Sequence, residues 1–113
     1  MSPIATSIYQ LLLRQARSRE PSITYGELAA KASVHVRSSK LYAALGEISL
    51  ACRHEGLPCL PAIVWSAETR RPSDGYYKVA HPRAHTDEAR VSAWEREHAK
   101  VLSAAADFPA KLA

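Results

Sequence analysis

Apolar side chains recur every three to four positions in several stretches of the chain, which is the spacing of a helix with one buried face. The first stretch predicts a helix over residues 4–16, and Pro21 ends the helical pattern that begins there. Thr24, followed three positions later by Glu27, has the form of a capping box. A short second helix is therefore predicted to begin at Tyr25.

The longest apolar stripe belongs to a predicted third helix. Either Ser38 or Ser39 can cap its start, and it runs to about His54. The stripe follows helical spacing and consists of Leu41, Leu45, Ile48 and Cys52. A last helix, capped by Thr86, extends to about Ala106 and carries one apolar seam.

Two segments between the third and last helices predict strands. Residues 60–65 end in β-branched and aromatic side chains, and residues 76–79 form a candidate return strand. The polar residues 66–75 would then be the loop of a β-hairpin. Because neighbours on a strand point to opposite faces, we expect one of Tyr76 and Tyr77 to be buried and the other exposed.

This order of elements is typical of one fold. A helix-turn-helix followed by a hairpin predicts an α+β winged helix-turn-helix, with three helices, a β-hairpin wing and an added C-terminal helix. We expect residues 1–106 to form this single domain and residues 107–113 to be a frayed tail.

Composition is that of an ordinary globular protein of 113 residues, with 47% hydrophobic and 23% charged residues. No apolar run is long enough for a membrane span, and the first residues lack the pattern of a signal peptide, so we expect a cytoplasmic protein. Cys52 and Cys59 are expected to be buried free thiols. With His54 they offer only three ligands, too few for structural zinc, and we expect neither a metal nor a cofactor.

Positive charge is concentrated in the first half of the chain. The net charge is +4, and residues 1–54 carry seven Lys and Arg against three Glu. These cations coincide with the helix-turn-helix, whose third helix would lie in a groove of double-stranded DNA, the expected partner. The candidate DNA-binding residues are His35, Arg37, Ser38, Ser39 and Lys40 around the start of the third helix, with Tyr42 and Ala43 beyond them, and Arg70 and Arg71 in the hairpin loop.

Three short segments resemble a known family. Residues 23–29 (ITYGELA), 44–46 (ALG) and 74–76 (DGY) are similar, in the same order, to segments of the alkylguanine-DNA alkyltransferases and alkyltransferase-like proteins. The resemblance covers about residues 23–79 and implies a winged-helix-type fold that binds DNA through the minor groove.

The chain departs from this family at the reactive motif, Pro-Cys-His-Arg. The equivalent place, near Pro61, has the sequence Pro-Ala-Ile-Val instead. Cys59 lies before it and lacks the His-Arg pair that activates the thiolate in the family. We therefore expect no alkyl transfer by Cys59 and a protein that is not an enzyme.

A longer run, residues 45–76, resembles small winged-helix-like modules that are fused to nucleases or carried by mobile elements and bacterial defence systems. The resemblance implies a bacterial or phage protein in a defence or mobile-element context. It assigns no established activity.

Two further functions remain open. One is a protein–protein interaction module, or a phage- or effector-type inhibitor of a host protein, with a possible homodimer seam on the last helix at Val91, Trp94 and Val101. The other is a degenerate alkyltransferase-like damage binder. That hypothesis predicts a pocket between the third helix and the wing and a preference for a modified base.

Overall fold

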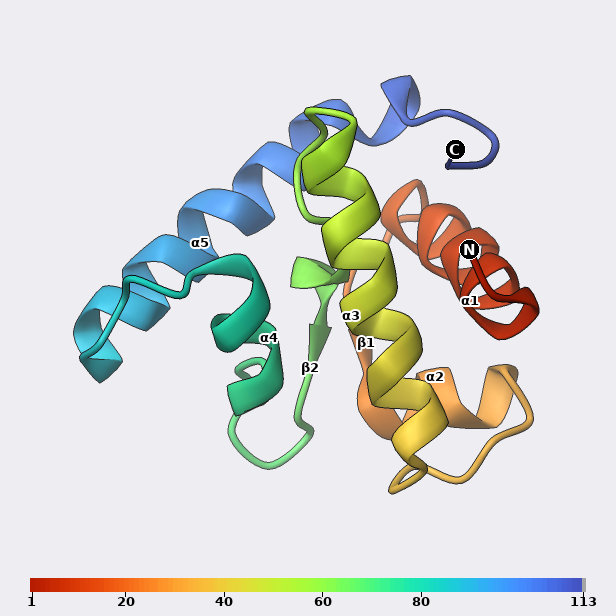
Figure 1. Cartoon of the computed structure of the whole chain (residues 1–113), viewed down its shortest axis with the longest axis horizontal. Helices are drawn as coiled ribbons and strands as arrows, with labels where there is room; N and C mark the ends of the chain where they lie inside the picture. Colours follow the sequence, from red (N-terminus) through yellow and green to blue (C-terminus); the bar gives the residue numbers. More distant parts are fainter. Residues whose placement is uncertain (113) are drawn as a thin grey trace.

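The computed structural model describes residues 1–112 and contains five α-helices around one core (Figure 1). The elements in chain order are α1 (Pro3–Ala16), β1 (Ile23–Thr24), α2 (Tyr25–Lys31), α3 (Ser39–His54), the 3-10 helix η1 (Leu60–Ile63), β2 (Val64–Trp65), α4 (Asp74–Ala80), α5 (Asp87–Ala104) and the 3-10 helix η2 (Ala105–Asp107). None of the helices in this described part is long and apolar enough to cross a membrane.

The predicted winged-helix class is wrong. The two strands run parallel, with Ile23 opposite Val64 and Thr24 opposite Trp65, and they form a two-stranded sheet. Parallel strands need a long crossover, which here contains α2 and α3. Within residues 1–112 there is consequently no β-hairpin and no wing.

Helix α4 occupies the place of the expected return strand. Asp74 lies in its first turn and forms an ion pair with Lys78 one turn later, at 2.9 Å. Tyr76 and Tyr77 are both buried, at 7% and 6% exposure, so the expected alternation is also wrong. A helix packed against α3 on one side can turn two successive residues inward, and Tyr77 lies under the guanidinium of Arg90 from α5.

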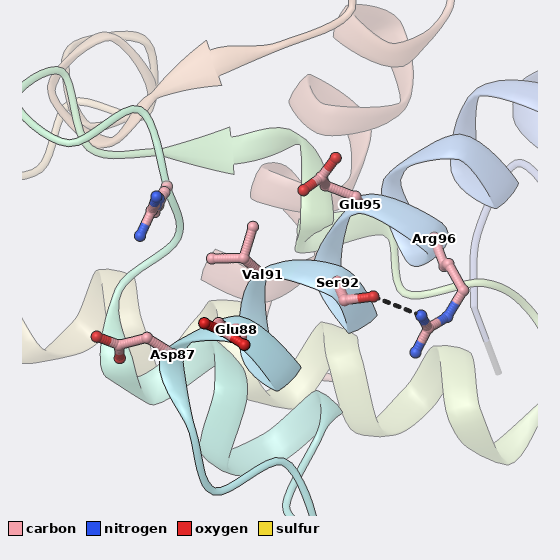
Figure 2. A pocket seen from close by; sticks show the side chains of 7 residues that line it. Asp87, Glu88, Val91, Ser92, Glu95 and Arg96 are labelled. Carbon is pink, nitrogen blue, oxygen red and sulfur yellow. Dashed lines mark hydrogen bonds between the residues drawn. The ribbon is translucent and has the colours of Figure 1, made fainter.

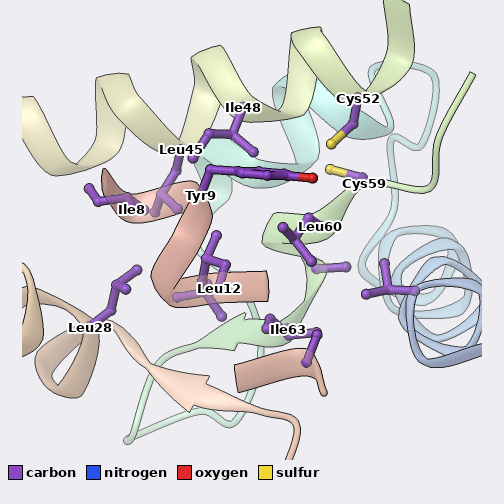
Figure 3. Close-up of a cluster of buried hydrophobic side chains, with 14 of the residues drawn as sticks. Ile8, Tyr9, Leu12, Leu28, Leu45, Ile48, Cys52, Cys59, Leu60 and Ile63 are labelled. Carbon is purple, nitrogen blue, oxygen red and sulfur yellow. The ribbon is translucent and has the colours of Figure 1, made fainter. Parts of the chain in front are cut away.

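Helix α3 is the centre of the fold and contacts α1, α4 and η1. Its predicted apolar stripe is confirmed, because Leu41, Leu45, Ile48 and Cys52 are all buried. Figure 3 shows α3 side chains facing those of α1 and η1 across this core. The predicted capping box of α2 is also confirmed, since Thr24 accepts from the Glu27 N–H and Glu27 accepts from the Thr24 N–H.

The apolar run expected as a strand is mostly the 3-10 helix η1. Pro61 stands in its first turn, where a missing N–H costs nothing. All four residues of η1 are buried, and the carbonyl of Ala62 accepts a hydrogen bond of 2.8 Å from the Trp94 indole of α5. Only Val64 and Trp65 are extended.

The segment after Ala106, expected to fray, packs against α1. Phe108 and Leu112 are buried, and the Tyr9 hydroxyl donates to the carbonyl of Pro109 at 2.6 Å. The Arg17 guanidinium donates to the carbonyls of Ala105 and Phe108, which lie past the end of α5. Ala113 lies outside the described residues.

Candidate nucleic-acid interface

Five of the predicted DNA-binding residues lie in the turn before α3 or in the first two positions of the helix. The Ser38 hydroxyl caps α3 by accepting from the Lys40 N–H at 3.2 Å. Of the two predicted caps, Ser38 and Ser39, the cap is therefore Ser38. His35 Nδ1 accepts from the Arg37 N–H at 3.0 Å. The side chains of His35, Arg37, Ser39 and Lys40 are exposed, so four of the five candidates are accessible to a partner.

Arg70 and Arg71 lie in the loop between β2 and α4, because there is no hairpin to carry them. The Arg70 N–H donates to the Ser66 carbonyl at 2.8 Å, and the Ser66 N–H donates to the Arg71 carbonyl at 2.9 Å, which closes the loop on itself. Both arginines are exposed. Figure 1 places this loop and the turn before α3 at the same end of the molecule, in separate segments.

A cavity of about 190 Å³ lies between α3 and α4, beside the start of α2. Tyr25 and Tyr42 contribute neighbouring rings whose centroids are 5.5 Å apart. Gly46 of α3 and Tyr76 of α4 line it as well. Tyr42 is 40% exposed, which places it at the rim, whereas Tyr25 and Tyr76 are buried.

The cavity lining carries no formal charge. No Lys, Arg, His, Asp or Glu is among its residues, and burial raises the pKa of both Tyr25 and Tyr76, so these phenols stay neutral. The nearby Asp74 carboxylate is paired with Lys78 and with Arg90, at 2.9 and 2.7 Å. These hydrogen-bonded cations hold the pKa of Asp74 below its usual value.

Two hydrogen bonds connect the cavity to the loop of Arg70 and Arg71. The Tyr25 hydroxyl donates to Ser73 Oγ at 3.1 Å and accepts from the Ser73 N–H at 2.8 Å. Ser73 follows Arg71 by two residues, and Tyr42 follows Lys40 by two. The two predicted basic segments therefore lead directly into the cavity walls.

A second, more open hollow of about 630 Å³ lies along the start of α5. Figure 2 shows Asp87, Glu88 and Glu95 around it, with Arg96 donating to the Ser92 hydroxyl at 2.7 Å. Arg71 lines it too. Three carboxylates repel phosphate groups, so this hollow is a poor surface for DNA.

The two cysteines are buried free thiols in the structure, as predicted. The Cys59 thiol donates to Ser49 Oγ at 3.2 Å, and burial raises the pKa of Cys59 to about 12. Burial also raises the pKa of Cys52. Both thiols stay protonated near neutral pH, and a protonated thiol is a poor nucleophile.

Sequence reasoning missed the cavity's main residues as a set. The capping pattern predicts Tyr25 as a helix start, and the turn residues around Ser73 predict a loop, but neither pattern indicates a cavity wall. A signal was nonetheless present: each of the segments 23–29, 44–46 and 74–76, quoted for the family resemblance, supplies at least one lining residue. The damage-binder hypothesis expected a pocket between the third helix and the wing; there is no wing in residues 1–112, and the cavity lies between α3 and α4 instead.

Comparison of the chain with protein-family models, with curated proteins and with solved structures found no significant match.

Proposed function

We propose that the protein is a non-enzymatic domain that binds double-stranded DNA through the start of α3 and holds one base in the cavity between α3 and α4. The observation that carries this proposal is an uncharged, tyrosine-walled cavity whose lining residues Tyr42 and Ser73 each follow an exposed cation, Lys40 or Arg71, by two positions. Arg37 and Lys40 can contact the phosphate groups of the DNA backbone. The cavity can hold a base, which is flat and neutral.

The size and chemistry of the cavity support one ring system as its occupant. A dry apolar cavity of about 150 Å³ admits benzene, so about 190 Å³ is a space for a single flat group. Tyrosine rings offer faces and edges for aromatic contact. A base reaches such a site only by leaving the duplex, which is easiest for a damaged or mismatched base.

Two further observations support a binding role over a catalytic one. The protonated state of Cys59 argues against alkyl transfer to its sulfur. The segments that resemble alkyltransferases and alkyltransferase-like proteins line the cavity, whereas the reactive Pro-Cys-His-Arg motif of that family is replaced near Pro61, which favours binding without transfer. Cytoplasmic residence and a defence or mobile-element context stay predictions from the sequence.

Fluorescence anisotropy of a labelled duplex tests the DNA-binding part. We expect binding at about 50 mM salt that weakens steeply towards about 200 mM, because binding releases counterions from the phosphates. Replacing Arg37 and Lys40 with Ala should lower the salt slope by about two. The matched control replaces Arg14 of α1 and Lys111 and should leave the slope nearly unchanged. Absence of binding at low salt overturns the proposal.

A cavity-filling variant tests the base-binding part separately. A Cβ built at Gly46 meets no atom within 4 Å, and leucine favours a helix interior more than glycine does. Gly46→Leu should therefore fold, fill the cavity and abolish any preference for a duplex containing O6-methylguanine over the same duplex with guanine. Ala99→Leu, on the exposed surface of α5, is the control. An unchanged preference in Gly46→Leu would exclude the cavity while leaving DNA binding intact.

A protein–protein interaction module is the second candidate. Leu50 projects from α3 with 55% of its surface exposed, the most of any large apolar side chain in residues 1–112. The predicted homodimer seam on α5 is less accessible to a second copy, because Trp94 and Val101 are buried within the chain. Light scattering of the purified protein, with Leu50→Ser for comparison, separates a dimer from a DNA-binding monomer.

A further inference from the structure

Tyr76 lines the cavity, but its hydroxyl contacts a residue that lies outside the cavity. Its hydroxyl lies 2.9 Å from Nε2 of His81, the residue that follows α4, and the two rings meet edge to face at 5.2 Å. His81 does not line the base cavity. It belongs to a polar hollow on the other side, which Arg53, Cys59 and Glu97 also line.

Apart from Tyr42 at the exposed rim, the other hydroxyls of the cavity wall are bound to groups that do not titrate near neutral pH. Tyr25 is bound to Ser73, and Ser49 Oγ donates to the Leu45 carbonyl at 3.0 Å while it accepts from the protonated Cys59 thiol. No buried side-chain nitrogen or oxygen in residues 1–112 lacks a partner. Tyr76 is distinct among these hydroxyls because its partner is an imidazole, which can gain a proton.

We propose that His81 is a positioning residue for the cavity: neutral His81 holds the Tyr76 hydroxyl hydrogen away from the bound group, and protonated His81 releases it. This inference rests on the proposed base-binding function and deepens it. It makes the hydrogen-bonding character of the cavity depend on a residue that the bound base never touches.

The chemistry follows from the donors and acceptors of the pair. In the tautomer of neutral His81 that carries its hydrogen on Nδ1, Nε2 accepts the phenolic hydrogen of Tyr76, which is then not offered to a group in the cavity. When His81 takes a proton from solvent, both ring nitrogens carry hydrogen and Nε2 can only donate. The Tyr76 oxygen must then accept, and its hydrogen needs another acceptor, which a base with an exposed oxygen or nitrogen supplies.

The surroundings of His81 keep it neutral under ordinary conditions. Burial lowers its pKa from the usual value of 6.5, and Arg53 from α3 and Arg96 and Lys100 from α5 lower it further, whereas Glu97 from α5 raises it. The Tyr77 ring, 6.5 Å away, and the Cys59 thiol are uncharged. His81 therefore gains its second ring proton at a pH below the usual histidine pKa of 6.5.

The test measures how the preference between two duplexes depends on pH. The probes are identical labelled duplexes with O6-methylguanine or guanine at one position, titrated by anisotropy at about pH 7.5 and about pH 4.5, the lower value being well below the usual histidine pKa of 6.5 because burial lowers that of His81. In the wild-type protein we expect the affinity ratio to change about three- to tenfold, the value of one hydrogen bond. Tyr76→Phe should make the ratio independent of pH.

Two His81 variants separate positioning from a merely structural role. His81→Gln retains a neutral hydrogen-bonding group and should keep the neutral-pH ratio while losing its pH dependence. His81→Leu removes the partner and should change the ratio at both pH values, with thermal melts checking that each variant is folded. A pH dependence that persists in folded His81→Gln overturns the inference alone. Absence of any wild-type DNA binding overturns the proposed function, and this inference with it.

Discussion

At the scale of single residues, the contact between Tyr25 and Ser73 makes the sharpest prediction. Tyr25→Phe removes one donor and one acceptor from a buried site and leaves the Ser73 N–H without its partner. We expect a loss of about 1–3 kcal/mol in the free energy of unfolding, measured by urea denaturation. Tyr42→Phe, at the exposed rim, is the matched control and should change little. Equal stability of the two variants would contradict this.

Residues whose partners are close in sequence were predictable. Thr24 and Glu27 satisfy each other across three positions, and Ser38 caps the helix that begins one residue later, so local spacing was sufficient. Tyr25 and Ser73 are 48 positions apart, and no local pattern joins them. The candidate cations were found because charge is visible in a sequence, whereas the cavity beside them depends on packing and is not.

At the scale of elements, the segment after η2 acts as part of the core. Phe108 is 4% exposed, so Phe108→Ala should lower the free energy of unfolding by about 3 kcal/mol through lost burial and the space left behind. Lys111→Ala, exposed in the same segment, should change it by less than about 0.5 kcal/mol. Thermal and urea unfolding of both variants check this. An unchanged free energy of unfolding in Phe108→Ala would mean that this segment contributes nothing to the stability of the fold.

Helices with a clear apolar stripe or a capping box were predicted well, whereas the short helical segments η1 and α4 were predicted as strands. Residues 60–63 and 74–80 are both rich in apolar or aromatic side chains, which favours a strand when no period is visible. In the structure, η1 is buried and contacts both α3 and α5, whereas α4 contacts α3 and buries Tyr76 and Tyr77, and a helical turn suits such surroundings as well as a strand does. The parallel pairing of β1 with β2 joins positions 41 residues apart, which local propensity cannot reveal.

At the scale of the whole molecule, buried titratable groups bound the pH range of stability. Burial raises the pKa of Cys59 from 9.0 to about 12 and of Tyr9 from 10.0 to about 12. Such groups stabilise the fold fully below the unfolded-state pKa, and the contribution is lost as the pH rises towards the folded-state value. Burial lowers the pKa of His81 and His98 from 6.5, so their contribution is present above 6.5 and is lost as the pH falls.

We therefore expect the free energy of unfolding to be flat between about pH 6.5 and about pH 9 and to fall on both sides. On the alkaline side the slope should reach about 1.4 kcal/mol per pH unit for each group that ionises only in the unfolded chain. Urea unfolding from about pH 5 to about pH 11 measures this curve. Cys52 and Cys59 are the buried groups that ionise first in the unfolded chain, so Cys59→Ala should make the alkaline fall shallower from about pH 9 while Cys52 still contributes. A wild-type stability that stays constant up to about pH 11 would mean that these groups are accessible to solvent and that the core around Tyr9 is not closed.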